Sequence, residues 1–310
     1  MRFGVQLGVD APTDPESLVE LARGAESSAF DSFWVGDHVI IPNAIDHSSH
    51  ERSVGGSRRF ADRTLVPTSE PLTTLAFLAA AVTTIRLGVA VLVVPLRNPI
   101  LCAKMLASID TLSGGRLDVG VGAGWIEAEF EALGAPAFSA RGAATDDYLD
   151  SMIALWTQAE PFHEGTHSIV RDVSMLPKPR QSPHPPLWVG GNGMPALRRV
   201  ARIGQGWLPL FQNPDEIIVK RAKLIELCET SGRDGADVRI AVGCRFAFDE
   251  GLGQDRPLLS GTASQMRDDV RRYEDAGIEE LHLVTAVPNL DVAWALDNWR
   301  RFADEVVARL

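Results

Sequence analysis

The 310-residue sequence is poor in cysteine, in long apolar stretches and in clustered positive charge. Its three cysteines, Cys102, Cys228 and Cys244, are too few for a disulfide framework, and none forms a close-spaced pair of metal ligands with another. This usage is typical of a protein from a reducing compartment. We therefore expect all three thiols to be buried and inert.

No apolar stretch is long enough to cross a membrane. The longest, residues 87–96, falls short of the ~20 residues that a spanning helix needs, and it contains Gly88 and Pro95. The chain opens on the alternating pattern of a strand at residues 2–7, not on a charged segment followed by an apolar one, so we expect no signal peptide. These features favour a soluble, cytoplasmic protein with no membrane partner.

The net charge of −11 is spread along the chain, with no block rich in lysine or arginine. Surfaces that bind nucleic acid are basic, so nucleic acid is not an expected partner. A ligand that carries phosphate would need local binding elements, because the overall charge repels it.

Several catalytic and metal-binding motifs are also missing. The sequence has no G-x-S-x-G turn and no cysteine in a catalytic signature. Residues 46–51 (DHSSHE) contain potential metal ligands but lack the H-E-x-x-H spacing, and Gly165 interrupts the spacing between His163 and His167. We expect no metal site.

What the sequence does contain is a regular alternation of short apolar runs with longer amphipathic segments, which is typical of βα units and a parallel sheet. Eight units without a linker half-way favour a closed (β/α)₈ TIM barrel that forms one domain over residues 1–310. A doubly wound open sheet is the rival, because alternation alone serves both architectures. The expected strands are residues 3–7, 32–36, 86–91, 116–120, 187–190, 206–209, 239–242 and 280–284.

Two connections are too long for simple βα loops. They are insertions after strands 2 and 4, at residues 39–69 and 123–186, and the second is expected to contain one helix at about residues 143–157. Both begin at the carboxyl end of a strand, which is the rim where barrel enzymes hold their chemistry. The other helices have clear start signals: Asp14, Asn98, Thr262 and Asp291 each begin a helix, and residues 69–71 (SEP) open another. Gly277 is an expected C-cap, and the last helix is expected to run to Leu310.

Asp37 and His38 end the second strand and are the main polar candidates for catalysis. A histidine can exchange a proton near neutral pH, and a neighbouring carboxylate can orient it or tune its charge. The alternative is structural: Asp37 would cap a turn while His38 forms hydrogen bonds within the loop. Their position at a strand end favours the functional interpretation.

Glycine-rich segments follow the fourth and fifth strands. Residues 120–125 (GVGAGW) allow backbone N–H groups to approach a ligand, but Trp125 stands where a dinucleotide fingerprint has its third glycine. Residues 188–193 (WVGGNG) lead into a helix at residues 194–202, and such a turn binds phosphate without lysine. These glycines could equally serve only a tight turn.

Other strand ends offer apolar or backbone surfaces. Residues 92–99 place backbone groups at the mouth and could seat a flat ring, or be a connection stiffened by prolines. The tryptophans Trp34, Trp125, Trp188 and Trp207 could wall a pocket for a planar ligand, although each could instead be core packing.

Taken together, these segments resemble the bacterial luciferase-like monooxygenase superfamily, and most closely its coenzyme F420-dependent oxidoreductase branch. The match is strongest at residues 96–104 (LRNPILCAK), 109–116 (IDTLSGGR), 120–125 and 129–130. Residues 36–38 (GDH), 41–42 and 186–191 support it. The resemblance covers about residues 1–210, while the remaining third matches mainly in its alternation of predicted strands and helices.

The resemblance implies a luciferase-like barrel that commonly forms a homodimer. It places Asp37 and His38 beside the cofactor ring, with His38 as proton donor or acceptor and Asp37 orienting it or the cofactor. The end of the third strand would form a backbone bulge behind the ring. The implied cofactor-binding residues are Val91 and Leu92 at the bulge, Gly122, Ala123, Gly124, Trp125 and Glu129 after strand 4, and Val189, Gly190, Gly191 and Asn192 at the phosphate.

The implied reaction is hydride transfer between coenzyme F420, a 5-deazaflavin, and a small organic substrate such as an alkene, alcohol or imine. FMN-dependent relatives share residues 112–116, so the alternative is an FMN-dependent monooxygenase that uses O₂ and a separate cofactor-reducing enzyme. Residues 36–38, 122–125 and 189–192 in combination favour the deazaflavin. A non-catalytic flavin-binding relative is a third possibility.

The substrate itself is not identified by the sequence. Arg58, Arg59, Phe60 and Arg63 fall where the family pattern is loosest. They could bind an anionic substrate, a cofactor tail or only water.

Overall fold

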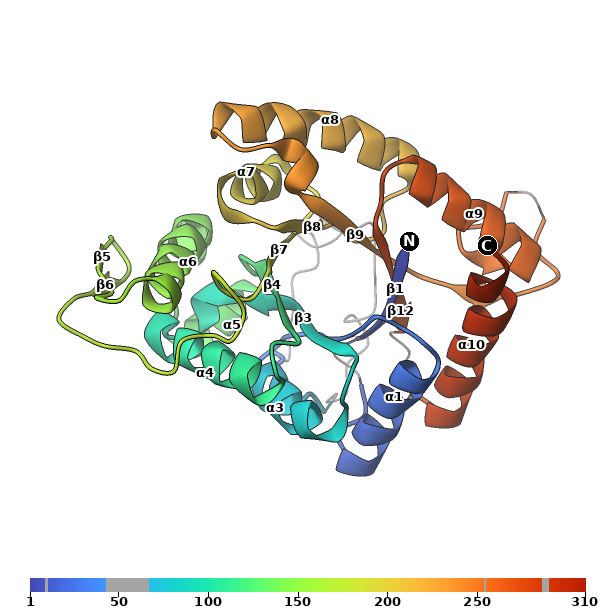
Figure 1. Ribbon diagram of the computed structural model, residues 1–310, viewed down its shortest axis with the longest axis horizontal. Coiled ribbons are helices and arrows are strands. Elements are labelled where there is room, and N and C mark those ends of the chain that lie inside the picture. Colours follow the sequence, from blue (N-terminus) through green and yellow to red (C-terminus); the bar gives the residue numbers. More distant parts are fainter. Residues whose placement is uncertain (9–10, 43–66, 254, 286–289) are drawn as a thin grey trace.

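The computed structural model describes residues 1–8, 11–42, 67–253, 255–285 and 290–310. Eight parallel strands close into a barrel in the order β1-β12-β9-β8-β7-β4-β3-β2, surrounded by helices (Figure 1). The predicted TIM barrel is confirmed, and the open doubly wound sheet is excluded. The barrel strands are β1 (Arg2–Leu7), β2 (Ser32–Val35), β3 (Arg86–Val93), β4 (Leu117–Gly122), β7 (Leu187–Gly190), β8 (Gly206–Leu208), β9 (Arg239–Cys244) and β12 (Glu280–Thr285).

The helices follow the strands in sequence and pack outside them. The side chains of Asp14, Asn98, Thr262 and Asp291 each accept a hydrogen bond from a backbone N–H in the first turn, as predicted, and Glu70 does the same for Thr73. The helices are α1 (Pro15–Ser27), α3 (Pro71–Ala81), α4 (Pro99–Leu112), α5 (Glu127–Ala132), α6 (Arg141–Thr157), α7 (Met194–Ile203), α8 (Pro214–Thr230), α9 (Ala263–Asp275) and α10 (Val292–Glu305).

Shorter elements complete the chain. Helix α10 ends at Glu305 and a separate 3₁₀ turn follows, so the expectation of one helix to Leu310 was wrong. The 3₁₀ turns are η2 (Val94–Leu96), η3 (Phe138–Ala140), η4 (Gly235–Asp237) and η5 (Val307–Arg309), and the strand pairs outside the barrel are β5 (His163–Glu164) with β6 (Ile169–Val170) and β10 (Ala247–Phe248) with β11 (Ser260–Gly261).

The insertion after β4 is richer than expected. Besides α6, it contains the short helix α5 and the β5-β6 hairpin, which projects beyond α6 (Figure 1). The other insertion, after β2, lies mostly outside the described residues. Arg58, Arg59, Phe60, Arg63 and the sequence at residues 46–51 fall there, so the structure does not test what we expected of them.

Two tryptophans fill the middle of the barrel. The rings of Trp34 and Trp188 meet edge to face, with centroids 6.2 Å apart, and both are buried. A Cβ at Gly88 would lie 2.2 Å from Trp34, and one at Gly206 would lie 2.1 Å from Trp188. Glycine at these strand positions therefore makes room for the large rings.

The tryptophans and cysteines singled out in the sequence lie mostly in the core. Trp34, Trp188 and Trp207 are buried, so core packing explains three of the four tryptophans that we considered as pocket walls, and only Trp125 stays half exposed. All three cysteines are buried thiols, as predicted. Within the described part of the chain, no helix has the length and apolar character needed to cross a bilayer.

Candidate active site at the barrel mouth

Burial inside the barrel differs between its middle and the carboxyl ends of its strands. Trp34 and Trp188 are buried at mid-height, whereas Ala90, Val91 and Gly190, which lie nearer the carboxyl ends, are partly exposed. The tryptophans thus fill the lumen below these partly exposed residues. Barrel enzymes place their active sites at this end.

A β-bulge in β3 shapes that surface. Val89 pairs with Val119 and Leu92 pairs with Val121, so β3 advances by three residues where β4 advances by two. The Ala90–Val91 peptide bond in this stretch is cis. The bulge predicted around Val91 and Leu92 is therefore present. The Leu92 side chain is buried in the core, so only its backbone and the half-exposed Val91 can face a ligand.

The glycines on the neighbouring strands make room for this bulge. A Cβ at Gly122 or at Gly190 would lie 2.6 Å from a γ-carbon of Val91, and one at Gly120 would lie 2.2 Å from the Val89 carbonyl oxygen. We expected glycine here for close approach of a ligand. The structure adds a second reason, because larger residues would displace the bulge.

Asp37 holds the end of β3 through a buried ion pair. Its carboxylate accepts two hydrogen bonds from the Arg97 guanidinium, at 2.7 and 2.8 Å, and one from the Val93 N–H at 2.8 Å. Arg97 also donates to Glu70 at 2.8 Å. These contacts link the second and third strand ends to the start of α3.

The electrostatics of this pair follow from burial and charge. Burial raises the pKa of the Asp37 carboxyl, an effect that the adjoining guanidinium and the Val93 N–H limit. Burial lowers the pKa of Arg97, but the hydrogen bonds and charges of Asp37 and Glu70 outweigh it, so the net shift is upward. Arg97 is therefore a permanent cation at this site.

His38 is oriented by a buried glutamate. Its Nδ1 lies 3.0 Å from one carboxylate oxygen of Glu129, and the other oxygen accepts from the N–H groups of Val39 at 2.8 Å and Ile40 at 3.3 Å. Both side chains are buried. The Trp125 ring stands edge-on to the imidazole, with centroids 6.0 Å apart. Glu129, which we expected at the cofactor, thus fixes the imidazole and the chain after it.

The loop after β4 passes between His38 and the bulge. Gly124 has φ +80°, and a Cβ there would lie 2.7 Å from both Phe130 and Val93. A glycine is therefore required at this turn. Ala123 and Trp125 on either side stay half exposed, so they remain available to a ligand at the mouth.

The loop after β7 lies next to the loop after β4, because β7 pairs with β4 in the barrel. The Asn192 amide donates to the Leu210 carbonyl at 2.9 Å and its oxygen accepts from the Leu210 N–H at 3.0 Å, which ties this loop to the end of β8. Gly191 is exposed with φ +116° at the start of α7, where no side chain caps the helix. The Val189 side chain is buried in the core. Binding of an anion here would thus use mainly backbone N–H groups.

Two residues of the site were missed in the sequence. In the sequence, Arg97 stands out only as part of a family motif, and Glu70 only as part of a helix start. Asp37 could have pointed to a cation at this site. It is a carboxylate at a strand end, and a carboxylate that is buried needs a cation nearby. The structure shows which cation it is.

Comparison with known proteins identifies the family. The profile of the luciferase-like monooxygenases matches residues 1–254. The chain belongs to this family. It is accordingly an oxidoreductase built on a luciferase-like TIM barrel. An uncharacterized protein of Mycobacterium tuberculosis is 34% identical over 259 residues, which is 81% of this chain and 89% of the relative.

Other relatives differ in their cofactor. The FMNH(2)-dependent dimethylsulfone monooxygenase of Pseudomonas putida is 30% identical over 200 residues, covering 64% of this chain and 54% of that protein. An F420-dependent secondary alcohol dehydrogenase superposes with a TM-score of 0.78 at 18% identity, covering 99% of this chain and 98% of the other. Long-chain alkane monooxygenase gives 0.82 at 14% identity, covering 100% and 91%. These two superpositions show the shared fold.

Proposed function

We propose that the protein transfers a hydride between coenzyme F420 and a small organic substrate at the barrel mouth. The observation that carries the proposal is the buried His38–Glu129 pair, with Nδ1 and Oε2 3.0 Å apart, at a strand end beside the β3 bulge. A fixed imidazole next to an accessible backbone bulge suits a reaction in which a proton and a hydride move together.

The residues at the mouth fit a deazaflavin. Val91 offers a partly exposed apolar surface for a flat ring, and Trp125 stands half exposed beside His38. The exposed glycines at the start of α7 present backbone N–H groups to a phosphate, in a chain whose net charge is −11. When bound, the deazaflavin supplies a carbon that accepts or donates hydride and reacts poorly with O₂.

His38 and Asp37 have different roles in this proposal. Glu129 holds Nδ1 of His38 and so orients the imidazole, which would take a proton from an alcohol or give one to a substrate as it is reduced. Both Asp37 oxygens are bonded to Arg97, and one also accepts from Val93. Asp37 is therefore a positioning residue, which keeps the bulge in place.

An FMN-dependent monooxygenase with a separate reductase is the second candidate. The similarity to the Pseudomonas putida enzyme, whose name specifies FMNH(2), favours it. The two candidates differ in their need for oxygen.

Turnover without oxygen separates these candidates. Protein loaded with F420 is mixed anaerobically with secondary alcohols, imines or activated alkenes, and the absorbance of the deazaflavin is followed. The proposal predicts substrate-dependent reduction or oxidation without O₂. Product formation only with FMN, a reductase and O₂ would establish the second candidate.

We further propose a homodimer that acts in the cytoplasm, with a cofactor-reducing enzyme as a functional partner. The absence of a spanning helix in the described residues and the buried thiols are consistent with that compartment. Light scattering on the purified protein tests the dimer, since a single 33.6 kDa mass would contradict it.

A further inference from the structure

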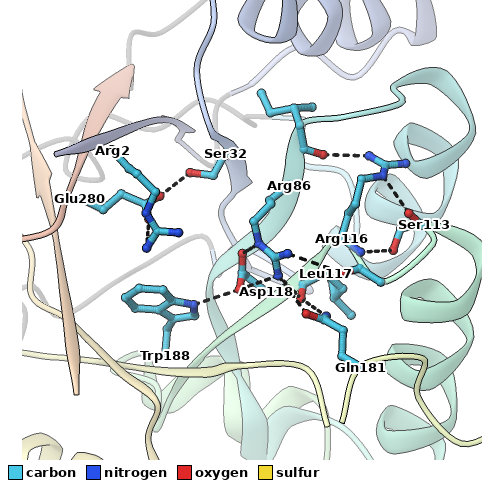
Figure 2. Close-up of polar contacts among 12 residues, drawn as sticks. Arg2, Ser32, Arg86, Ser113, Arg116, Leu117, Asp118, Gln181, Trp188 and Glu280 are labelled. Carbon is cyan, nitrogen blue, oxygen red and sulfur yellow. Dashed lines mark hydrogen bonds and ion pairs between the residues drawn. The ribbon is translucent and has the colours of Figure 1, made fainter. Parts of the chain in front are cut away.

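The opposite end of the barrel has a second polar cluster. Here the amino-terminal ends of the strands bring together Arg2, Arg86, Asp118 and Glu280, with the Trp188 indole beside Asp118 (Figure 2). Arg86 donates to Asp118 at 2.5 and 3.0 Å, and Arg2 lies 3.3 Å from Glu280. This end of a barrel ordinarily serves stability, and the Arg86–Asp118 pair fits that role.

Both carboxylates of the cluster already have several partners. One oxygen of Asp118 also accepts from the Trp188 indole N–H at 3.2 Å. One oxygen of Glu280 lies 2.6 Å from the Ser32 hydroxyl and 3.0 Å from His282 Nε2, and the other faces Arg2. Every oxygen of the two acids therefore has a partner before a further cation of the cluster is considered.

Arg239 is that further cation. It begins β9, is only partly exposed, and its guanidinium lies 4.5 Å from the centre of the Trp188 ring. The described residues give its guanidinium no hydrogen bond or ion pair. Burial and the charges of Arg2 and Arg86 lower its pKa, against the effect of Asp118 and Glu280. The cluster thus holds three guanidinium groups against two carboxylates.

We propose that this end of the barrel binds a phosphate group, with Arg239 as its principal ligand and Arg2 beside it. A guanidinium that is partly desolvated and unpaired gains more from an oxoanion than an exposed one does, since the anion supplies the missing hydrogen bonds. A second charge of the same sign nearby strengthens the attraction. The phosphate belongs to the free ion or to the end of a phosphate monoester.

Equilibrium dialysis at constant ionic strength tests the site. Radiolabelled inorganic phosphate is titrated against the wild-type protein, Arg239→Met and Arg300→Met. The methionine keeps an apolar stem over Trp188 and removes the charge. Arg300 is an exposed arginine of α10 that is paired with Asp297, so its variant matches the change in net charge without touching the cluster.

The proposal predicts saturable phosphate binding in the wild type and in Arg300→Met. Arg239→Met should bind one phosphate fewer per chain, or bind it with an affinity at least about tenfold weaker. Any phosphate held at the cofactor loop survives in all three proteins. Asp118→Asn, which removes one negative charge, is expected to tighten binding. Equal stoichiometry and affinity in wild type and Arg239→Met would overturn the proposal, as would the absence of saturable binding.

Glycerol phosphate distinguishes the two sources of the group. If it displaces labelled phosphate with similar affinity, the site accepts the end of a monoester. If it does not compete, the site is restricted to the free ion. Because this cluster lies at the far end of the lumen from His38, the outcome is independent of the proposed redox reaction.

Discussion

At the scale of single residues, the proposed function depends most on His38. Replacing it with alanine should lower kcat about 100-fold or more while deazaflavin affinity changes little, because general acid–base groups contribute roughly 10²–10⁴-fold to rates. Steady-state kinetics and a cofactor titration on the same preparation measure both effects. Retained turnover in His38→Ala would remove the imidazole from the mechanism.

Glu129→Gln is the companion variant. The amide oxygen can still accept from the Val39 N–H, so the loop should keep its conformation, but the negative charge beside Nδ1 is lost. The imidazole then loses the charged acceptor that orients it, so the variant should lower kcat by roughly 10-fold or more while deazaflavin affinity changes little. An unchanged kcat would mean that Glu129 only supports the backbone.

The Asp37–Arg97 pair predicts an asymmetry in stability. Arg97→Met leaves a buried carboxylate without its cation and should destabilise the protein by about 3–5 kcal/mol. The double variant Asp37→Asn, Arg97→Met removes the uncompensated charge and should recover part of that loss. Denaturant unfolding of wild type, Asp37→Asn, Arg97→Met and the double variant is the measurement. If the double variant loses as much stability as the two single variants together, the pair is not energetically coupled.

At the scale of secondary-structure elements, the β3 bulge depends on glycines in its neighbours. Gly190→Ala should destabilise the fold by about 1–3 kcal/mol, because its methyl group would overlap a γ-carbon of Val91. Val91→Ala removes that carbon, so the double variant should be closer to wild type than Gly190→Ala alone. Thermal unfolding of the four proteins checks this, and strictly additive losses would contradict the assigned contact.

The elements themselves were largely predictable, but their contacts were not. β-branched runs and N-cap residues such as Asn98 reveal strands and helix starts, because those signals are local. The six-residue helix α5 is too short to show a period, so the helical position of Glu129 was missed. Asp37 and Arg97 lie 60 positions apart, and nothing local in the sequence pairs them.

The same limit applies to the glycines. Their clustering after β4 and β7 is visible in the sequence, which suggests close approach of a ligand or a tight turn as the reason. Part of the reason is Val91, which comes from a different strand and reaches Gly122 and Gly190 only after the barrel closes. Long-range packing of this kind is read from the structure.

At the scale of the whole molecule, the barrel should lose stability in acid. Although burial acts to raise it, hydrogen bonds from His282 and Ser32 and the charge of Arg2 lower the pKa of Glu280 from 4.5 to about 2. The unfolded chain therefore takes up this proton at higher pH than the folded one. The contribution of Glu280 is present above about pH 4.5 and is lost as the pH falls towards 2.

Unfolding free energies measured between pH 6 and about pH 2 check this expectation. Glu280→Gln should be less stable than wild type at pH 6, and the difference should shrink in acid, because the wild-type carboxylate is then protonated too. A constant difference across this range would assign the effect of the substitution to packing.

The central claim for the whole protein is that its barrel mouth is a deazaflavin site. The most direct test is a paired titration in which F420 and FMN are each added to the same purified protein and binding is followed by absorbance and fluorescence. The account predicts saturable binding of F420, with FMN weaker under the same conditions. Tight binding of FMN with no binding of F420 would contradict it.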